Sequence, residues 1–374
     1  MHSPTRLPVT VVTGFLGAGK TTVLRHLLLN SGQRLAVLVN EFGEVGIDGA
    51  LLRSCGFCPD EELDGRLVEL ANGCLCCTVQ DDFLPTMERL LERSDQLDGI
   101  VVETSGLALP EPLVAAFGWP SVRTRTRVHG VVAVVDGQAL AAGHVVADAQ
   151  ALEAQRAADP SLDHLDAIED LFEDQLQAAD LVLISRADLL AADELAALTS
   201  SLQHRTRTGT PMLPVAHGVL DPELLLGTSL MQRRVHDSDR AHADDRGHAN
   251  GHHDHGRDHN QGPDHDHDHE HVHVAIDSFA FELKGRWQQT ELEASLQSLL
   301  DAQILIRLKG WLAMPGKQRL LQIQAVGPRL SCWYEGVAVG LDPADQLGRL
   351  QLVVLGFGLD REAIEQTLLG AVSG

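Results

Sequence analysis

Three of the chain's 6 cysteines lie within four positions, in the stretch ELANGCLCCTVQDDF. They are Cys74, Cys76 and Cys77. Thiolates bind Zn²⁺, Co²⁺ and Cu⁺, and two or three thiolates from one turn can supply part of a tetrahedral shell. A helix that begins near Thr78 or Asp81 would favour the thiolate form, because a helix N-terminus carries partial positive charge. The cysteine cluster therefore predicts a metal site.

Two other interpretations of this cluster stay open. Cysteine is often buried as a small apolar residue, although polar residues flank this cluster, and two of the three thiols could instead form a redox-active disulfide. Cys55 and Cys58, in CGFC, have a spacing that suits either a metal or a disulfide. Cys332 is expected to pack beside Trp333.

A glycine-rich segment near the N-terminus has the spacing of a phosphate-binding loop. GFLGAGKT, from Gly14 to Thr21, matches G-x-x-x-x-G-K-[ST], follows a strand-like run and opens a helix-like one. Its glycines let backbone N–H groups turn toward phosphates, and the helix N-terminus adds partial positive charge. Lys20 would reach the β- and γ-phosphates, and the Thr21 hydroxyl can ligate Mg²⁺. The segment predicts a nucleoside triphosphate site, the alternative being an ordinary glycine-rich turn.

Acidic residues in two segments could complete the magnesium site. VVETSG places Glu103 at the end of an apolar strand, with Gly106 three residues later, as in a Walker B acid and a γ-phosphate sensor. NEFGEVGID places Glu41 and Glu44 on a glycine-rich loop, and Glu41 is the better candidate. Loops of this kind are ordered by the γ-phosphate and Mg²⁺ in nucleotide switches. The alternatives are a surface acid at a strand end and a solvated polar loop.

A third segment could select the base. Guanine-binding proteins usually present Asn-Lys-x-Asp after a strand, and here DLVLI is followed by SRAD. Asp188 can accept hydrogen bonds from two N–H groups of the guanine edge, and Arg186 can stack on a purine. Ser185 cannot replace all the hydrogen bonds of Asn. The segment favours guanine, with adenine as the alternative.

The segment from His236 to His273 contains 12 of the 19 histidines and almost no aliphatic residues. It cannot bury enough apolar surface to offset its ordering entropy, so it predicts a disordered linker. HDHDHEHVH alternates imidazole with mostly acidic side chains, which is typical of weak metal binding. The candidate ligands are His265, His267, His269 and His271. A solvated acidic linker is the alternative.

Apolar runs indicate the elements that must hold these residues. The runs are rich in Val, Ile and Leu and alternate with helical patterns, which is typical of an α/β domain with parallel strands. We predict this domain at 1–228, a His/Asp-rich linker at 229–273, and a small α+β domain at 274–374 with a closing helix. The strands predicted in the first domain lie at residues 7–12, 34–40, 99–106, 128–137 and 180–189.

Composition narrows the range of partners. The formal net charge of −24 argues against sequence-independent binding to nucleic acid and gives no affinity for anionic membranes. The chain has no apolar run of 18 residues and no signal-peptide pattern, so we expect a cytoplasmic protein. Close cysteines in that compartment are more often metal-binding or redox-active than structural.

Taken together, these motifs resemble the CobW family of P-loop GTPases, which act as metal chaperones or metallo-insertases. The resemblance covers nearly the whole chain and includes the family's hallmark, Cys-x-Cys-Cys after LANG. It implies a SIMIBI-type G domain with a mostly parallel sheet, followed by a small α+β CobW C-terminal domain. The segments that carry the resemblance are TGFLGAGKTT, NEFGEVGIDG, ELANGCLCCTVQDDF, ETSGLALPEPLVAAF and EDQLQAADLVLISRADLL.

The resemblance also implies a function. The protein would be a slow GTPase, with Lys20 and Glu103 as catalytic residues, that binds Co²⁺ foremost through Cys76 and Cys77. It would deliver Co²⁺ to cobaltochelatase in aerobic cobalamin biosynthesis, with Mg·GTP completing the metal site and hydrolysis releasing the ion. The candidate nucleotide and magnesium ligands are Gly14, Gly17, Ala18, Gly19, Lys20, Thr21, Thr22, Glu41, Glu103, Gly106, Ser185, Arg186 and Asp188.

The sequence also allows three rival functions. The nearest is a zinc chaperone of the same family, since thiolate ligands suit Zn²⁺ as well as Co²⁺. A passive store that holds metal on the histidine segment is a second rival, although the intact phosphate loop speaks against it. A nucleotide kinase is a third, but the chain shows no arginine-rich lid. A nucleotide-dependent homodimer is left open.

Overall fold

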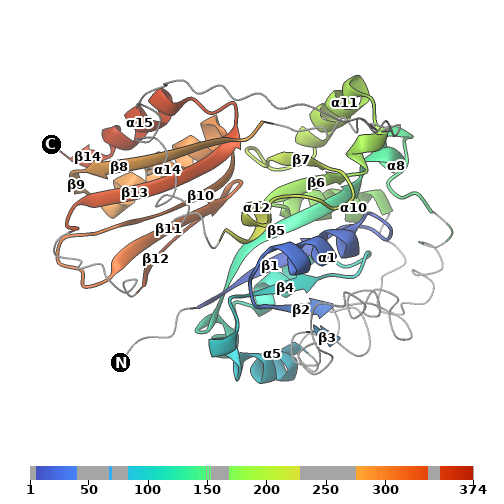
Figure 1. Ribbon diagram of the computed structural model, residues 1–374, viewed down its shortest axis with the longest axis horizontal. Helices are drawn as coiled ribbons and strands as arrows, with labels where there is room; N and C mark the ends of the chain where they lie inside the picture. The colour runs from blue at the N-terminus through green and yellow to red at the C-terminus, as the bar shows by residue number, and fades with distance from the viewer. Residues whose placement is uncertain are drawn as a thin grey trace, which may run out of the picture.

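The computed structural model describes the chain in several stretches. A parallel sheet of seven strands forms its N-terminal part, in the order β3-β2-β4-β1-β5-β6-β7 (Figure 1). The strands are β1 (Leu7–Thr13), β2 (Leu35–Val39), β3 (Leu67–Glu69), β4 (Gly99–Glu103), β5 (Thr126–Asp136), β6 (Leu181–Ser185) and β7 (Met212–Val215). The described residues are 6–39, 67–69, 83–148, 150, 152, 168–227, 275–335 and 346–373.

All five predicted strands of this sheet are confirmed. The strands β4 and β6 are buried at every position, as expected when helices cover both faces of a sheet. The prediction missed β3 and β7, which have three and four residues and lack a long apolar run.

Helices cover both faces of the parallel sheet, and the alternation of side chains along a strand decides which helices each residue meets. In β5, Val132 and Val134 pack with residues of α1 and α12. The neighbouring Ala133 and Val135 pack on the opposite face with residues of α10 and α11. The helical segments are α1 (Lys20–Asn30), α5 (Leu84–Leu91), η2 (Ser94–Gln96), α6 (Pro110–Ala116), α7 (Pro120–Arg123), α8 (Gly137–Ala141), α10 (Ile168–Ala178), η3 (Ala187–Leu189), α11 (Ala192–Gln203) and α12 (Pro222–Leu226).

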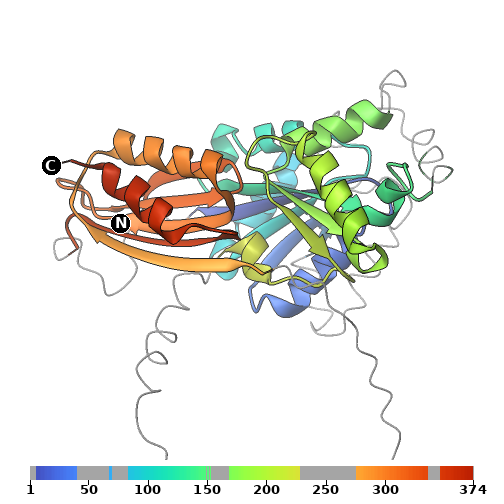
Figure 2. The same ribbon diagram turned by 90° about the horizontal axis from the view of Figure 1, so that it is seen from above.

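An antiparallel sheet of five strands forms the C-terminal part, in the order β12-β11-β10-β13-β8. Its helices α14 and α15 lie together on one face (Figure 2), where Leu292, Leu296 and Leu299 of α14 point into the core. The α+β character and the closing helix predicted for this part are confirmed. The elements are β8 (Asp277–Lys284), β9 (Arg286–Trp287), α14 (Gln289–Ala302), β10 (Ile304–Leu312), β11 (Leu320–Val326), β12 (Arg329–Glu335), β13 (Arg349–Phe357), α15 (Arg361–Gly370) and β14 (Val372–Ser373).

The expectation for Cys332 is wrong. Both Cys332 and Trp333 lie on β12, and consecutive side chains of a strand point to opposite faces. The Cys332 thiol packs against the helix-covered core, whereas the Trp333 ring lies under the guanidinium of Arg127, 3.4 Å from its centroid. Burial raises the pKa of Cys332 to about 12.

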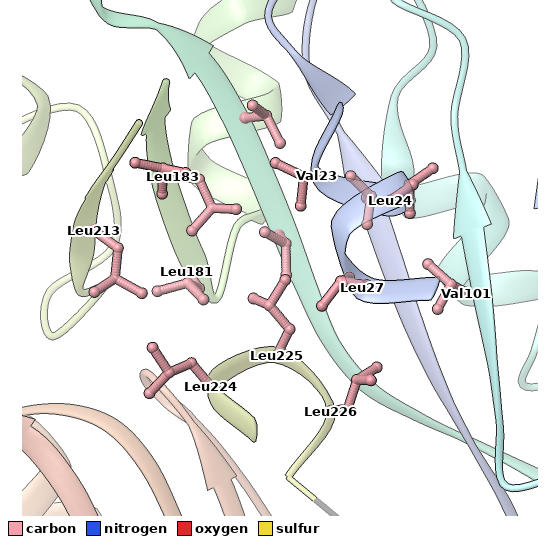
Figure 3. Close-up of a cluster of buried hydrophobic side chains, with 14 of the residues drawn as sticks. Val23, Leu24, Leu27, Val101, Leu181, Leu183, Leu213, Leu224, Leu225 and Leu226 are labelled. Carbon is pink, nitrogen blue, oxygen red and sulfur yellow. The ribbon is translucent and has the colours of Figure 1, made fainter. Parts of the chain in front are cut away.

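One buried hydrophobic cluster joins the two sheets, and we call it the shared cluster. It contains residues of β6 and β7, the whole apolar stretch Leu224–Leu226 of α12, and Ile306 and Val326 of the second sheet. Figure 3 shows Leu224, Leu225 and Leu226 of α12 beside side chains of the parallel sheet. The second sheet meets the parallel sheet near the amino ends of β5 and β6, where Arg329 pairs with Asp180. The carboxyl ends of the parallel strands lie at the opposite edge.

Candidate functional site

The phosphate loop connects β1 to α1 at the carboxyl edge of the parallel sheet. Gly14, Gly17 and Gly19 have φ angles of 136°, 76° and 102°, which only glycine adopts readily. The buried Nζ of Lys20 donates to the carbonyl oxygens of Gly14, at 2.8 Å, and Phe15, at 3.2 Å. The loop thus directs the lysine ammonium across its own backbone, as a phosphate-binding lysine requires.

Glu103 lies beside this loop, because β4 pairs with β1 and places Glu103 opposite Val12. Glu103 is 4% exposed, and its Oε1 lies 4.0 Å from Nζ of Lys20. The next residue, Thr104, donates a hydrogen bond of 3.0 Å to the hydroxyl of Thr13 and so joins the ends of β4 and β1. The structure therefore brings the predicted acid and the predicted lysine together.

Gly106 follows in a loop that approaches the phosphate loop closely. A Cβ at Gly106 would lie 2.7 Å from the backbone nitrogen of Leu16, so a larger residue would displace one of the two loops. Gln175 of α10 holds this loop from beneath: its Nε2 donates to the carbonyl oxygens of Gly106, at 3.2 Å, and Ala108, at 3.1 Å. Gly106 thus lies directly against the phosphate loop, and its role as a γ-phosphate sensor stays a prediction.

Magnesium fits this group of residues. Mg²⁺ takes oxygen ligands and is usually held by one or two protein groups together with phosphate oxygens. Thr21 follows Lys20 in the first turn of α1, and the buried Glu103 carboxylate lies beside Lys20, so both residues carry such oxygen donors. Thr21 and Glu103 thus fit as residues that would hold magnesium, and this assignment stays a prediction.

The segment that would read the base follows β6. The side chain of Ser185 is buried, and its Oγ has no hydrogen-bond partner among the described residues. Arg186 has a φ of 54° and pairs with the carboxylate of Asp136, while its Nη2 donates to the Gly17 carbonyl at 3.2 Å. The Asp188 carboxylate lies 3.5 Å from Nε2 of His217. SRAD is thus next to the phosphate loop, as a base-reading segment must be.

Several predicted site residues lie outside the described residues, and for them the assignments stay predictions. The same holds for the expected helix start near Thr78 or Asp81. Within the described ranges, no group of three His, Cys, Asp or Glu side chains gathers as a metal site. The predicted residues outside those ranges are Glu41, Cys55, Cys58, Cys74, Cys76, Cys77 and the histidines from His236 to His273.

Sequence reasoning missed Asp136, Gln175 and His217. A signal for Asp136 existed, because it ends the apolar run VVAVVD and precedes a glycine, much as Glu103 ends VVE. Gln175 and His217 carry no such local signal. Their roles depend on loops that are distant in sequence, 67 residues or more for the bonds of Gln175.

Comparison with known proteins supplies the family. A model described as the CobW/HypB/UreG nucleotide-binding domain matches residues 8–214, and the cobalamin synthesis protein cobW C-terminal domain matches residues 276–372. A protein of Pseudomonas aeruginosa named zinc chaperone CobW is 43% identical over 100% of this chain and 93% of its own length. The chain belongs to the CobW family.

Other relatives agree with this membership. A zinc chaperone CobW of a Sinorhizobium species is 40% identical over 98% of each chain. A zinc-regulated GTPase metalloprotein activator 1 of Schizosaccharomyces pombe is 42% identical over 35% of this chain and 32% of its own length. The family match and the P-loop geometry confirm two predictions: this CobW-family protein is a P-loop GTPase, and it has the predicted fold. Among the helices that the structure describes, none combines the length and apolar character that a bilayer-spanning helix needs.

Proposed function

We propose that this GTPase is a metallochaperone that binds a divalent metal ion at Cys74, Cys76 and Cys77 and transfers it to a client protein. The full-length identity of 43% to a protein named zinc chaperone CobW is the observation that carries the proposal. The names of the relatives favour Zn²⁺ as the cargo, and thiolates are common Zn²⁺ ligands.

Delivery of Co²⁺ to cobaltochelatase is the second candidate. The match of residues 276–372 to a C-terminal domain described as that of a cobalamin synthesis protein favours it. The type of ligand does not show which of the two metals is bound, because thiolates bind both. The relative affinities of a site for Zn²⁺ and Co²⁺ are set largely by the metals themselves.

Topology supports a link between the cysteines and the nucleotide. The strand β3 ends at Glu69, and the cysteines follow it in the chain. All strands of this sheet are parallel, so β3 ends at the same edge that carries the phosphate loop and Glu103. A metal site there would lie near loops that the γ-phosphate orders.

The chain's own groups would act on GTP as follows. Backbone N–H groups of the phosphate loop bind the phosphates, and Lys20 exchanges its carbonyl partners for phosphate oxygens. Thr21 and Glu103 would hold magnesium, which would neutralise part of the phosphate charge when bound. Asp188 accepts hydrogen bonds from the guanine edge, and the buried hydroxyl of Ser185 bonds to the base.

GTP hydrolysis would then control the release of the bound metal ion. The metal site is completed in the GTP form and loosened in the GDP form, which requires different metal affinities in the two forms. Competition titrations of Zn²⁺ and Co²⁺ against chromophoric chelators test this, with Mg·GTP, with Mg·GDP and without nucleotide. We expect tighter binding with Mg·GTP, and equal affinity in the GTP and GDP forms would refute the coupling.

Two variants sharpen this experiment. Cys76→Ser with Cys77→Ser should abolish the GTP-dependent binding, whereas Cys332→Ser should leave it unchanged, because Cys332 lies in the second sheet. Deleting residues 236–273 separates a chaperone from a store. A chaperone keeps its GTPase activity and its GTP-dependent site after the deletion, and a store loses its metal binding.

A further inference from the structure

Three loops meet around Arg186 at the carboxyl edge of the parallel sheet. The strands β5 and β6 are neighbours, and their last residues, Asp136 and Ser185, lie opposite each other. The phosphate loop is the third, because the Cβ position of Gly19 lies 3.5 Å from the Cβ atom of Ser185. Arg186 is the first residue after β6 and can reach both other loops.

The conformation of Arg186 is unusual and serves two contacts. Its backbone is left-handed, with φ 54° and ψ 30°, a region that non-glycine residues rarely occupy. Its Nη1 bonds to Oδ2 of Asp136, and its Nη2 donates to the carbonyl oxygen of Gly17 at 3.2 Å. A planar guanidinium offers several donors in a rigid fork, so it can bond to both loops at once.

The two carboxylate oxygens of Asp136 bond to different groups. Oδ1 accepts a hydrogen bond of 3.1 Å from the backbone nitrogen of Ala139 and so caps α8, while Oδ2 bonds to Arg186. The carboxylate is 3% exposed, whereas the Arg186 side chain is partly open to solvent. A buried carboxylate that is itself fixed by a helix cap is a rigid anchor for the longer, more mobile arginine.

We propose that Asp136 is a positioning residue for nucleotide binding: it holds Arg186 against the phosphate loop, with the guanidinium plane placed for the base. The proposal rests on the nucleotide site and is independent of the metal cargo. Asp136 and Arg186 act on the base side of the nucleotide, whereas Lys20 and Glu103 act at the phosphates. Losing Asp136 should therefore weaken GTP and GDP alike and leave the hydrolytic step unchanged.

The variant Asp136→Asn tests this, because the amide oxygen still caps α8 while the charge that holds Arg186 is lost. We expect GDP and GTP to bind about ten-fold more weakly, the size of one charge-assisted hydrogen bond, with KM raised and kcat unchanged. Asp360→Asn is the matched control. Asp360 caps α15 through a 3.0 Å bond from Ala363, in the second sheet's part of the molecule, and should leave binding unchanged.

A double-mutant cycle with Arg186→Met shows whether Asp136 acts through Arg186. We expect the double variant to bind fluorescent GDP no more weakly than Arg186→Met alone. The proposal would be overturned if the losses of GDP affinity in the two single variants added up in the double variant. It would also be overturned if Asp136→Asn bound GDP like the wild type, or if that variant changed only the melting temperature. The variant Lys20→Ala tests the location of the nucleotide site separately from the role of Asp136. If Lys20→Ala bound GDP as tightly as the wild type does, GDP would not bind at the phosphate loop.

Discussion

At the scale of single residues, the nucleotide site depends on side chains that bond to loop carbonyls. Lys20 bonds to the carbonyls of Gly14 and Phe15, and Gln175 bonds to those of Gly106 and Ala108. Buried carbonyl groups need such partners, so a change in one of these side chains alters the position of a loop. The loops in turn set the geometry around the phosphates.

Gln175→Met should therefore lower kcat for GTP hydrolysis roughly ten-fold, because small displacements of catalytic loops have effects of at least this size. It should also destabilise the fold by about 1 to 3 kcal/mol, since two carbonyls lose a donor. GDP affinity should not change if Gly106 has its predicted role at the γ-phosphate, because GDP lacks that phosphate. Single-turnover hydrolysis and GDP titration measure the two effects.

Gln177→Met is the matched control on the same helix. Gln177 is exposed, and its Nε2 bonds to the Arg205 carbonyl at 2.8 Å, away from the site. If Gln177→Met slowed hydrolysis as much as Gln175→Met does, the bonds to Gly106 and Ala108 would not be the cause.

Ser185 supports a second prediction at this scale. The buried Ser185 hydroxyl has no hydrogen-bond partner within the described ranges, which destabilises a fold, so Ser185→Ala should leave the melting temperature unchanged or raise it. GDP should bind more weakly, by about 1 kcal/mol, because the hydroxyl is then lost as a partner of the base. Unchanged GDP affinity in a thermally stable variant would remove Ser185 from the site.

At the scale of elements, the short helix α12 depends on the second sheet. Its last carbonyls point at two basic residues of β10: Arg307 Nη1 donates to Leu224 at 2.8 Å, and Lys309 Nζ donates to Gly227 at 2.8 Å. Burial lowers the pKa of Arg307 to about 9, with Glu223 opposing the shift, and lowers that of Lys309 to about 8, with Arg307 adding to the shift.

The lowered pKa of Lys309 predicts a rise of stability with pH. Between pH 8 and the ordinary value of 10.5, the unfolded chain binds a proton that the folded chain has released. The free energy of unfolding therefore increases with pH in this window, by on the order of 1 kcal/mol between pH 7.5 and 9.0. Because the pKa of Arg307 is lowered as well, urea unfolding should show a clearly larger rise in the wild type than in Lys309→Met. A parallel rise in Lys309→Met would assign it to another group.

A buried carboxylate joins elements of both sheets. Asp180 is fully buried, pairs with Arg207 and Arg329, and accepts a 2.8 Å hydrogen bond from the backbone nitrogen of Val131. Arg207 belongs to the parallel-sheet part and Arg329 to β12. The network therefore fixes the second sheet to the amino ends of β5 and β6.

Removing this carboxylate should destabilise the protein strongly. Asp180→Ala should lower the free energy of unfolding by about 3 kcal/mol, because it leaves two cations and a backbone donor unpaired. Arg329→Met should have a smaller effect, since Arg207 still pairs with Asp180. The control is Asp98→Ala in the exposed pair with Arg34, worth at most about 1 kcal/mol. Equal losses for Asp180→Ala and Asp98→Ala would show that burial adds nothing.

At the scale of the whole molecule, the shared cluster predicts cooperative unfolding of the two sheets. Leu181 and Leu213 pack in one cluster with Ile306 and Val326, so neither sheet completes its core alone. We expect one calorimetric transition, although a linker is predicted between the two parts at residues 229–273. Ile306→Ala should cost about 2 to 5 kcal/mol and shift that whole transition. Two separate transitions, with only one moved, would contradict the prediction.

The sequence by itself determined the residues whose chemistry is local. Three patterns are contiguous in the sequence: the phosphate loop, Glu103 after its strand, and SRAD after β6. Each pattern indicates both the residue types and the strand or helix beside them. The five longer strands were equally readable, because burial on both faces imposes an uninterrupted apolar run.

Only the tertiary structure decided the pairings between distant segments. Asp136 and Arg186 are 50 residues apart, and Gln175 lies 69 residues from Gly106. Parallel strands bring their carboxyl ends to one edge whatever the length of chain between them, and no local pattern encodes which ends become neighbours. The shared cluster has the same origin, because an apolar residue on a strand does not specify which sheet will cover it.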